Sequence, residues 1–221
     1  MQQGTTQEQG RTAQMNNIAA AKAVAQSVRT TLGPMGMDKM LVDEGGDVII
    51  TNDGATILRE IDIEHPTAKM IIEIAKTQEQ ECYDGTTSAV IVAGELLKRC
   101  EELIEQSIHP TTICRGLRKG LVFLIKEMKA YEITDVDLLQ IAKTALTGKS
   151  ADSFKDIIGK ICVEAVQHTE SLDEIRITKA LGGSAADSEI INGIIIDKER
   201  CHPAMPTKLN EPLIALIDSN L

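Results

Sequence analysis

The sequence is poor in aromatic side chains and in basic charge. Its 221 residues include no Trp, two Phe and two Tyr, and 33 acidic residues outnumber 23 basic ones, for a formal net charge of −10. Nucleic-acid binding relies on clustered Lys and Arg and on aromatic rings that stack on bases. We therefore expect no nucleic-acid partner, and the acidic balance also disfavours anionic membrane surfaces.

Long apolar runs and paired cysteines are also missing. The longest apolar run, Ala89 to Ala93, is interrupted by Gly94 and Glu95 and falls well short of the ~20 residues that span a bilayer. Residues 1–6 lack an apolar signal core. The cysteines are odd in number, widely spaced and without a C-x-x-C pair, which disfavours a disulfide framework or a zinc site; they are Cys82, Cys100, Cys114, Cys162 and Cys201. We predict a cytoplasmic protein with no membrane partner.

The hydrophobic content, 43%, fits a folded chain, and its periodicity is mainly helical. A polar, disordered tail is expected over residues 1–10. Lys39–Val42 and Asp47–Thr51 flank a Gly-rich connection, which predicts a β-hairpin. The fold class predicted is α+β, mostly α-helical. Apolar spacing predicts helices over 11–31, 67–81, 85–105, the stretch after Pro110, 135–146 and 153–167, followed by β-like segments near 175–177, 190–196 and 213–217.

Three glycine turns stand ahead of or between these elements. They are Leu32-Gly33-Pro34-Met35-Gly36, Asn52-Asp53-Gly54-Ala55-Thr56 and Asp84-Gly85-Thr86-Thr87-Ser88. A carboxylate beside glycine and hydroxyls at a helix start combines a Mg²⁺ ligand, bare backbone N–H donors and the positive end of the helix dipole. Each turn has an ordinary explanation too, because Asp is a common N-cap and Gly-Pro commonly ends a helix.

Taken together and in this order, the three turns and their flanks resemble the amino-terminal part of a group II chaperonin subunit, the family of the archaeal thermosome and its eukaryotic cytosolic relatives. The resemblance runs from about Gln14 to the last residue and is nearer to the thermosome branch. It implies a first segment of the equatorial domain over 11–137, a first segment of the intermediate domain over 138–200, and the start of the apical domain over 201–221.

The resemblance also implies a site for ATP and Mg²⁺. Asp84 takes the place of the metal ligand, and Asp53 the place of the catalytic carboxylate that positions the attacking water. Lys149, in Thr147-Gly148-Lys149, falls in a nucleotide-sensing loop, although a solvated surface lysine is the competing reading. The other implied nucleotide contacts are Leu32, Gly33, Pro34, Gly54, Gly85, Thr86, Thr87 and Ser88.

The run Thr147-Gly148-Lys149 is not a P-loop, because that motif needs glycine six residues before its lysine, where this chain has Lys143.

Tyr83 departs from the family, which usually has glycine before the metal-binding Asp84. If that position needs a positive φ, the tyrosine strains the loop by roughly 1–3 kcal/mol, and we predict weakened but not abolished binding of Mg-nucleotide.

The expected function is that of an ATP-hydrolysing chaperone subunit. Its implied partners are other chaperonin subunits, in a ring of one or several subunit types, and unfolded protein clients. The family's third catalytic carboxylate lies in a returning segment that these 221 residues do not contain, so hydrolysis by this chain alone is expected to be slow or missing. The alternative is a non-hydrolysing structural or interaction module of a chaperonin assembly. An independent small phosphotransferase would need a group that orients the nucleophile and a substrate pocket, and the sequence shows no convincing set of residues for these.

Overall fold

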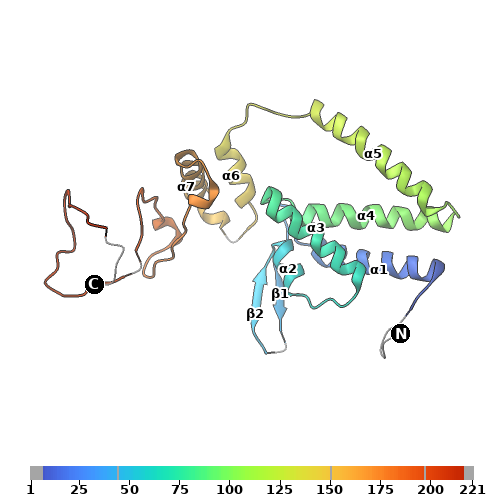
Figure 1. Cartoon of the computed structure of the whole chain (residues 1–221), viewed down its shortest axis with the longest axis horizontal. Coiled ribbons are helices and arrows are strands. Elements are labelled where there is room, and N and C mark those ends of the chain that lie inside the picture. Colours follow the sequence, from blue (N-terminus) through green and yellow to red (C-terminus); the bar gives the residue numbers. More distant parts are fainter. Residues whose placement is uncertain (1–6, 44, 150, 197, 217–221) are drawn as a thin grey trace.

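A computed structural model describes residues 7–43, 45–149, 151–196 and 198–216. The described part is mostly helical with one small sheet, which confirms the predicted fold class (Figure 1). The described part also contains three short 3-10 helices, Asp152–Phe154, Leu172–Glu174 and Ala185–Asp187. The main elements are α1 (Gly10–Arg29), β1 (Lys39–Val42), β2 (Val48–Thr51), α2 (Gly54–Glu60), α3 (Pro66–Cys82), α4 (Thr86–Glu105), α5 (Pro110–Ala130), α6 (Leu138–Leu146) and α7 (Lys155–His168).

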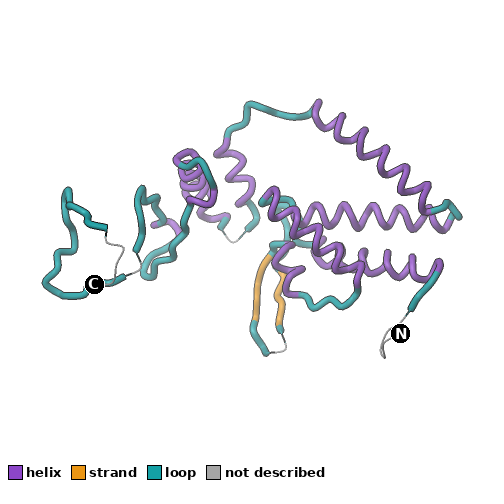
Figure 2. Tube along the Cα trace, in the orientation of Figure 1, coloured by secondary structure: helices purple, strands orange, loops and turns teal. Residues whose placement is uncertain are grey.

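The core lies where α1, α2, α3 and α4 pack together, and Figure 2 shows the three long helices side by side. Small residues on α1 and α3 let these helices approach closely, and larger side chains from α2 and α4 fill the space between them. The core residues with the lowest exposure include Ala21, Val28, Ile57, Leu58, Ala75 and Val90. This bundle holds the starts of α2 and α4 in fixed places.

The predicted hairpin is confirmed and leads directly into the second glycine turn. Strands β1 and β2 pair antiparallel, with Lys39 opposite Thr51 and Val42 opposite Val48. The hairpin projects from the bundle (Figure 1), and most of its apolar side chains are exposed. Its last residue, Thr51, accepts a hydrogen bond from the Asp53 amide through Oγ1 at 3.1 Å, so the sheet delivers the chain to Asp53 in a defined direction.

Helix α5 leaves the bundle. It contacts α4 only near its own start and then runs away from it, as Figure 1 shows. Ile113 is its one buried residue. Many of its apolar side chains are therefore exposed: Leu117, Leu121, Val122, Phe123, Leu124, Ile125 and Met128.

Helices α6 and α7 form a separate pair. They pack on each other, and Lys143 Nζ lies 2.6 Å from Asp156 Oδ1 between them. The β-like segments predicted after this pair are wrong, since the described residues of 175–177, 190–196 and 213–217 contain no strand. A strand exists only when a neighbouring segment accepts and donates its backbone hydrogen bonds, and none pairs here, where Ile177 is 90% and Leu213 103% exposed. Residue 217 lies outside the described residues.

The amino-terminal tail is largely outside the part of the chain that the structure describes. Residues 1–6 of the predicted polar tail lie outside the described part, Gln7 to Gln9 have no regular structure, and α1 begins at Gly10. The other domain limits, near residues 137 and 200, stay predictions. Among the described helices, none is both long enough and apolar enough to cross a membrane.

Candidate functional site

The two Asp-Gly turns lie against each other at the starts of α2 and α4. Gly54, the first residue of α2, is buried, and a Cβ atom placed on it would lie 2.3 Å from Thr87 Oγ1 and 3.2 Å from Thr87 Cα. Atoms do not approach so closely, so this contact requires glycine at position 54. The turns are 31 residues apart in sequence, yet the backbone of one lies on the first turn of the other's helix.

The first glycine turn and the Lys149 loop meet in the same way. Gly148 has a φ of +75°, and a Cβ atom there would lie 2.3 Å from the carbonyl oxygen of Pro34. Asn52, next to Asp53, completes the connection with a long hydrogen bond of 3.5 Å from Nδ2 to the Gly148 carbonyl. Thus the segments that were predicted to share a site are linked in pairs, near the carboxyl end of α3 and the start of α4 (Figure 1).

The first turn is closed by its own backbone. The Gly36 amide donates to the Gly33 carbonyl at 2.9 Å, and the Met37 amide donates to the Thr30 carbonyl at 2.9 Å. Gly33 has a φ of +86°, in the left-handed region. The nucleotide contacts predicted in this turn, Leu32, Gly33 and Pro34, are all exposed. The turn begins at Leu32, three residues after Arg29, the last residue of α1, so the helix ends just before it, as expected for a Gly-Pro pair.

Asp53 acts as the N-cap of α2. Its Oδ2 accepts hydrogen bonds from the amide of Thr56 at 2.8 Å and from Thr56 Oγ1 at 2.7 Å. The capping role that competed with a catalytic role is therefore present in the structure. The carboxylate remains exposed, so capping does not shield it from a ligand, and its catalytic role stays a prediction.

Asp84 is placed differently. Its Oδ1 accepts from the Gly85 amide at 2.7 Å, and Gly85 rather than Asp84 occupies the N-cap position of α4. No described side chain caps this 20-residue helix. The amides of Thr86, Thr87 and Ser88 stand at its first turn, where donors lack intrahelical acceptors and the dipole favours negative charge.

Tyr83 adopts the left-handed conformation on which the strain argument depends. It has a φ of +56° and ψ of +7°, at the carboxyl end of α3. Such a conformation is unusual for a bulky residue that is not glycine. The side chain is 72% exposed, so packing of the ring does little to offset the unfavourable backbone conformation.

Lys149 is exposed, and it lies in the loop that contacts Pro34. This position is compatible with a nucleotide-sensing lysine and equally with a solvated surface lysine. The following turn is held by local bonds, including one of 2.9 Å from the Asp152 amide to the Lys149 carbonyl. The pKa of the Asp152 carboxyl is lowered, chiefly by a hydrogen bond from Lys155 and to a smaller extent by the backbone of Gly148. The loop thus has a fixed base on α6 and α7.

These residues fit a Mg-nucleotide better than a bare ion. Among the described residues, no group of three or more His, Cys, Asp or Glu side chains is arranged to hold a metal. Mg²⁺ in phosphate sites commonly takes only one or two carboxylates and completes its shell with phosphate oxygens and water. The exposed carboxylate of Asp84, beside an uncapped helix start, could supply the protein's share of such a set, and its role as a metal ligand stays a prediction.

Two features of this region could not be read from the sequence. Gln78 on α3 donates from Nε2 to the Asp84 carbonyl at 2.9 Å, six residues upstream and outside any motif. Thr56 belongs to the predicted turn, but nothing in its sequence context shows that its hydroxyl binds Asp53. No sequence signal would have identified Gln78, since glutamine on a helix is usually exposed.

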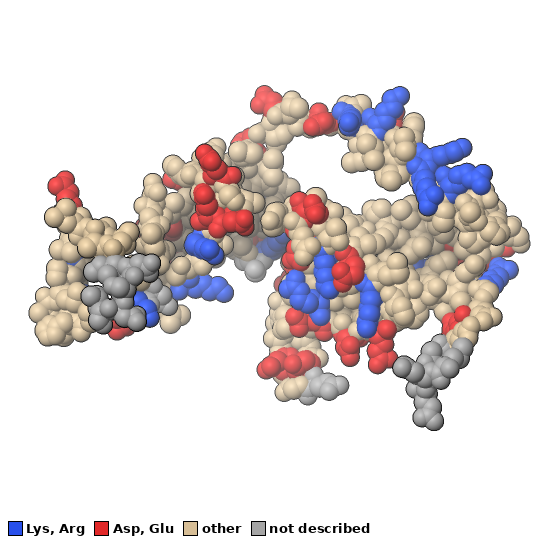
Figure 3. Space-filling model, in the orientation of Figure 1, with Lys and Arg blue, Asp and Glu red and all other residues tan. Residues whose placement is uncertain are grey.

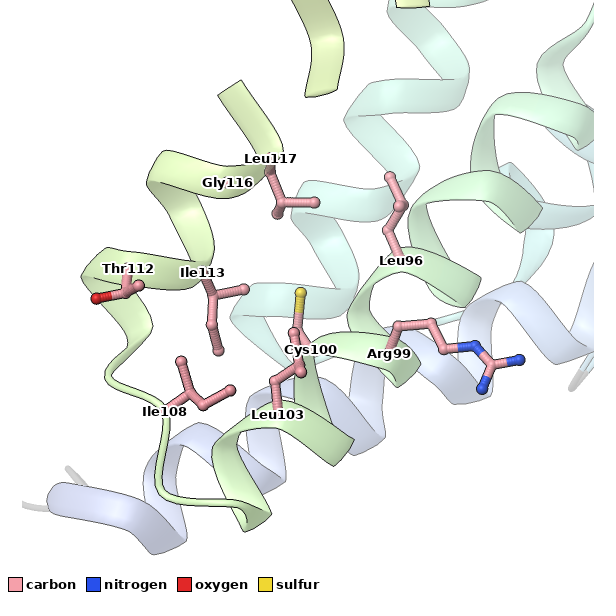
Figure 4. Close-up of a pocket in the computed structure, with 9 residues that line it drawn as sticks. All are labelled: Leu96, Arg99, Cys100, Leu103, Ile108, Thr112, Ile113, Gly116 and Leu117. Atoms are coloured by element: carbon pink, nitrogen blue, oxygen red, sulfur yellow. The ribbon is translucent and has the colours of Figure 1, made fainter. Parts of the chain in front are cut away.

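An apolar cavity lies elsewhere, between the carboxyl-terminal half of α4 and the start of α5 (Figure 4). Its volume is about 290 Å³, and leucine and isoleucine side chains from both helices point into it. Burial raises the pKa of the Cys100 thiol there, with a smaller effect from Cys114. Cys100 is fourteen residues beyond Thr86, about 21 Å along a helix axis, so this cavity is separate from the glycine turns.

Comparison with known proteins gives a consistent result. A sequence model of the TCP-1/cpn60 chaperonin family matches residues 24–221, which include all the turns described above. The chain is similar to a thermosome subunit of Methanopyrus kandleri, with 51% identity over 95% of this chain and 41% of the relative. Thermosome subunit alpha of Archaeoglobus fulgidus and of Thermoplasma acidophilum are each 48% identical over 100% of this chain and 43% of the relative. The chain spans about two fifths of the length of these relatives and corresponds to their amino-terminal part.

Proposed function

Because this chain belongs to the TCP-1/cpn60 chaperonin family, we propose that it is the nucleotide-binding portion of an ATP-dependent group II chaperonin subunit. Its partners would be other chaperonin subunits in a ring, and its clients unfolded proteins in the cytoplasm. The roughly 50% identity to thermosome subunits supports this assignment of branch. Residues 11–137, which include both Asp-Gly turns, would be the equatorial ATP-binding segment.

The observation that carries the proposal is the close contact between the glycine turns. Gly54 lies on Thr87, and Gly148 lies on Pro34, each at a distance that a side chain would prevent. An Asp-Gly turn alone is ordinary, but ordinary turns do not need to pack on one another across 30 or more residues. The first contact brings the Asp53 turn against the start of α4, next to Asp84, and the hydrogen bond from Asn52 to Gly148 links that turn to the Lys149 loop, which supports a shared site.

Each residue then has a physical role in binding. Asp84 offers its exposed carboxylate to Mg²⁺, and the amides of Thr86, Thr87 and Ser88 offer donors to phosphate oxygens. Gly33, Pro34, Gly54 and Gly85 present backbone with little side chain in the way. Bound Mg²⁺ would neutralise phosphate charge and polarise the terminal phosphate.

Asp53 and Lys149 would act on the terminal phosphate of ATP. Asp53 is held by Thr56 with its carboxylate exposed, which suits the orientation of a water molecule. Lys149 offers a positive charge from the loop at the end of α6. We propose that hydrolysis belongs to the full subunit, because the family's third carboxylate falls outside these residues, and that this chain by itself binds nucleotide with slow or no turnover.

The experiment is calorimetric titration of the chain with ATP in the presence of Mg²⁺. The wild type should bind saturably, and Asp84→Ala should bind about 10- to 100-fold more weakly, as expected for loss of one charged ligand worth about 1.5–3 kcal/mol. Asp62→Ala is a matched control, since Asp62 is exposed between α2 and α3 and away from the glycine turns. Absence of saturable binding by the folded wild type would overturn the proposal.

A second candidate is a non-hydrolysing interaction module, and the surface of α5 favours it. The helix exposes a long run of apolar side chains, and it carries five Lys or Arg against one acidic residue, the basic region of Figure 3. Large exposed apolar patches commonly mark association surfaces. Size-exclusion chromatography with light scattering distinguishes the candidates: a large ring supports the chaperonin particle, whereas a monomer or small assembly supports the module.

A further inference from the structure

The loop that holds Asp84 has an unusual backbone. Tyr83 and Gly85, on either side of Asp84, both have positive φ values, +56° and +76°. Two left-handed residues around one carboxylate make a sharp turn between α3 and α4, and the direction of the Asp84 side chain depends on that turn. Since the left-handed conformation of Tyr83 is unfavourable in isolation, contacts from outside the turn must help to hold it.

Gln78 supplies such a contact. From the last turns of α3 its Nε2 donates to the main-chain carbonyl of Asp84 at 2.9 Å. The same nitrogen would lie 3.3 Å from a Cβ atom built on Gly85, so the amide rests against both residues of the Asp-Gly pair. Gln78 is half-buried, which limits the other positions that its side chain can take.

The helix that carries Gln78 is itself fixed at this end. The Tyr83 amide donates to the Glu79 carbonyl at 3.0 Å, so α3 keeps its hydrogen bonds up to the turn. Glu79 Oε2 lies 3.1 Å from Arg59 Nη2 on α2, the helix that Asp53 caps. Gln78 therefore projects from a rigid element, which is the requirement for holding a neighbouring group in a precise orientation.

We propose that Gln78 is a positioning residue that orients Asp84 for Mg-nucleotide by fixing the Asp84 carbonyl. This inference rests on the proposed nucleotide-binding function and adds to it a residue that does not touch the ligand. Loss of the amide donor leaves the turn intact but releases the rotation of the Asp84 peptide. Partners that orient metal ligands typically contribute 10- to 100-fold to metal affinity, so the effect should appear in the Mg²⁺-dependent part of binding.

The test compares Gln78→Leu with Gln80→Leu. Gln80 is an exposed glutamine two residues along the same helix, which makes it a matched control for the loss of one amide. ATP affinity is measured for both variants in Mg²⁺ and again in EDTA, together with the melting temperature without nucleotide. Gln78→Leu should lose about tenfold or more in Mg²⁺ and little in EDTA, while Gln80→Leu should match the wild type in both.

Gln78→Met serves as a second variant, because methionine keeps the length and helix propensity of glutamine without a donor. Addition of Asp84→Ala to Gln78→Leu should weaken binding no further than Asp84→Ala alone, since both changes act through one carboxylate. Equal losses in Mg²⁺ and EDTA, or full affinity in both Gln78 variants, would overturn the inference and leave the proposed function standing. A wild type that binds no Mg-ATP would overturn both.

Discussion

The two Asp-Gly turns share a dipeptide but differ by one residue in how they start a helix. Asp53 is itself the N-cap of α2, with extended backbone angles and a side chain that binds the Thr56 amide. At the second turn Gly85 takes the N-cap position in a left-handed conformation, and Asp84 is displaced to the residue before it. The first carboxylate is therefore used by its own helix, and the second leaves its helix uncapped.

This difference indicates that one motif can serve two physical purposes. An N-cap satisfies a backbone donor and typically contributes about 1 kcal/mol to stability. An uncapped helix start retains donors and a positive dipole end, which are the groups that bind a phosphate. We therefore expect Asp53 to matter more for stability and Asp84 more for binding, and substitutions at four positions in the two turns test this comparison.

Asp84→Ala should have the largest effect, and only on binding. Affinity for Mg-ATP should fall by about 10- to 100-fold, whereas the free energy of unfolding should change little because the carboxylate accepts only the local Gly85 amide. Calorimetry and urea unfolding measure the two quantities. A variant that loses stability but keeps its affinity would reverse the roles assigned to the two turns.

Gly54→Ala should damage both turns together. A methyl group would enter the space of Thr87 Oγ1, and we expect a loss of about 1–3 kcal/mol in the free energy of unfolding, as for other overpacked sites, with weaker Mg-ATP binding. Gly120→Ala on α5 is the control, since no atom lies within 4 Å of a Cβ atom there, and alanine should raise helix stability by up to about 1 kcal/mol. Equal behaviour of the two variants in urea unfolding would show that the turns do not touch.

Asp53→Ala should cost about 0.5–2 kcal/mol of stability through loss of the N-cap. Asp53→Asn keeps a capping oxygen and removes the charge, so its unfolding should resemble that of the wild type. The same pair separates capping from catalysis in the full subunit, where Asn should retain stability and lose ATP hydrolysis. Equal ATPase rates for wild type and Asp53→Asn would contradict the catalytic role.

Tyr83→Gly should have the smallest effect on stability. Relief of the left-handed strain, about 1–2 kcal/mol, is largely offset by the greater entropy of glycine in the unfolded chain, about 0.4–1 kcal/mol. Thermal unfolding should show a small gain, and Mg-ATP affinity should rise because the loop no longer carries strain. Unchanged affinity in this variant would refute the prediction that Tyr83 weakens binding.

The sequence predicted most of the helices because helical periodicity and helix breakers are local signals. Proline at the starts of α3 and α5 and glycine after α1 mark boundaries that the structure places within a few residues. The hairpin was also predictable, since its strands are joined by a short Gly-rich turn. The segments at 175–177 and 190–196 share the β-branched pattern but lack a neighbour to pair with, and no local pattern reveals that absence.

The features of the candidate site also divide into local ones, which the sequence predicts, and contacts between distant segments, which it does not. The Asp-Gly turns and their order were visible in sequence, and the family's usual glycine before Asp84 suggested a positive φ at Tyr83 only as a condition, which the structure meets. The contacts of Gly54 with Thr87 and of Gly148 with Pro34 depend on how distant segments pack, as does the bond from Gln78 to the Asp84 carbonyl. The functional roles of these residues stay predictions until a ligand is bound.

The most direct measurement is an NMR titration of isotopically labelled chain with ATP and Mg²⁺, following the backbone amides of Gly33, Gly54, Gly85 and Gly148. Our account predicts that all four signals change together with one affinity, that Gly120 on α5 is unaffected, and that Asp84→Ala abolishes the common response. Signals that move independently, or a response confined to one turn, would contradict a nucleotide site shared by these loops.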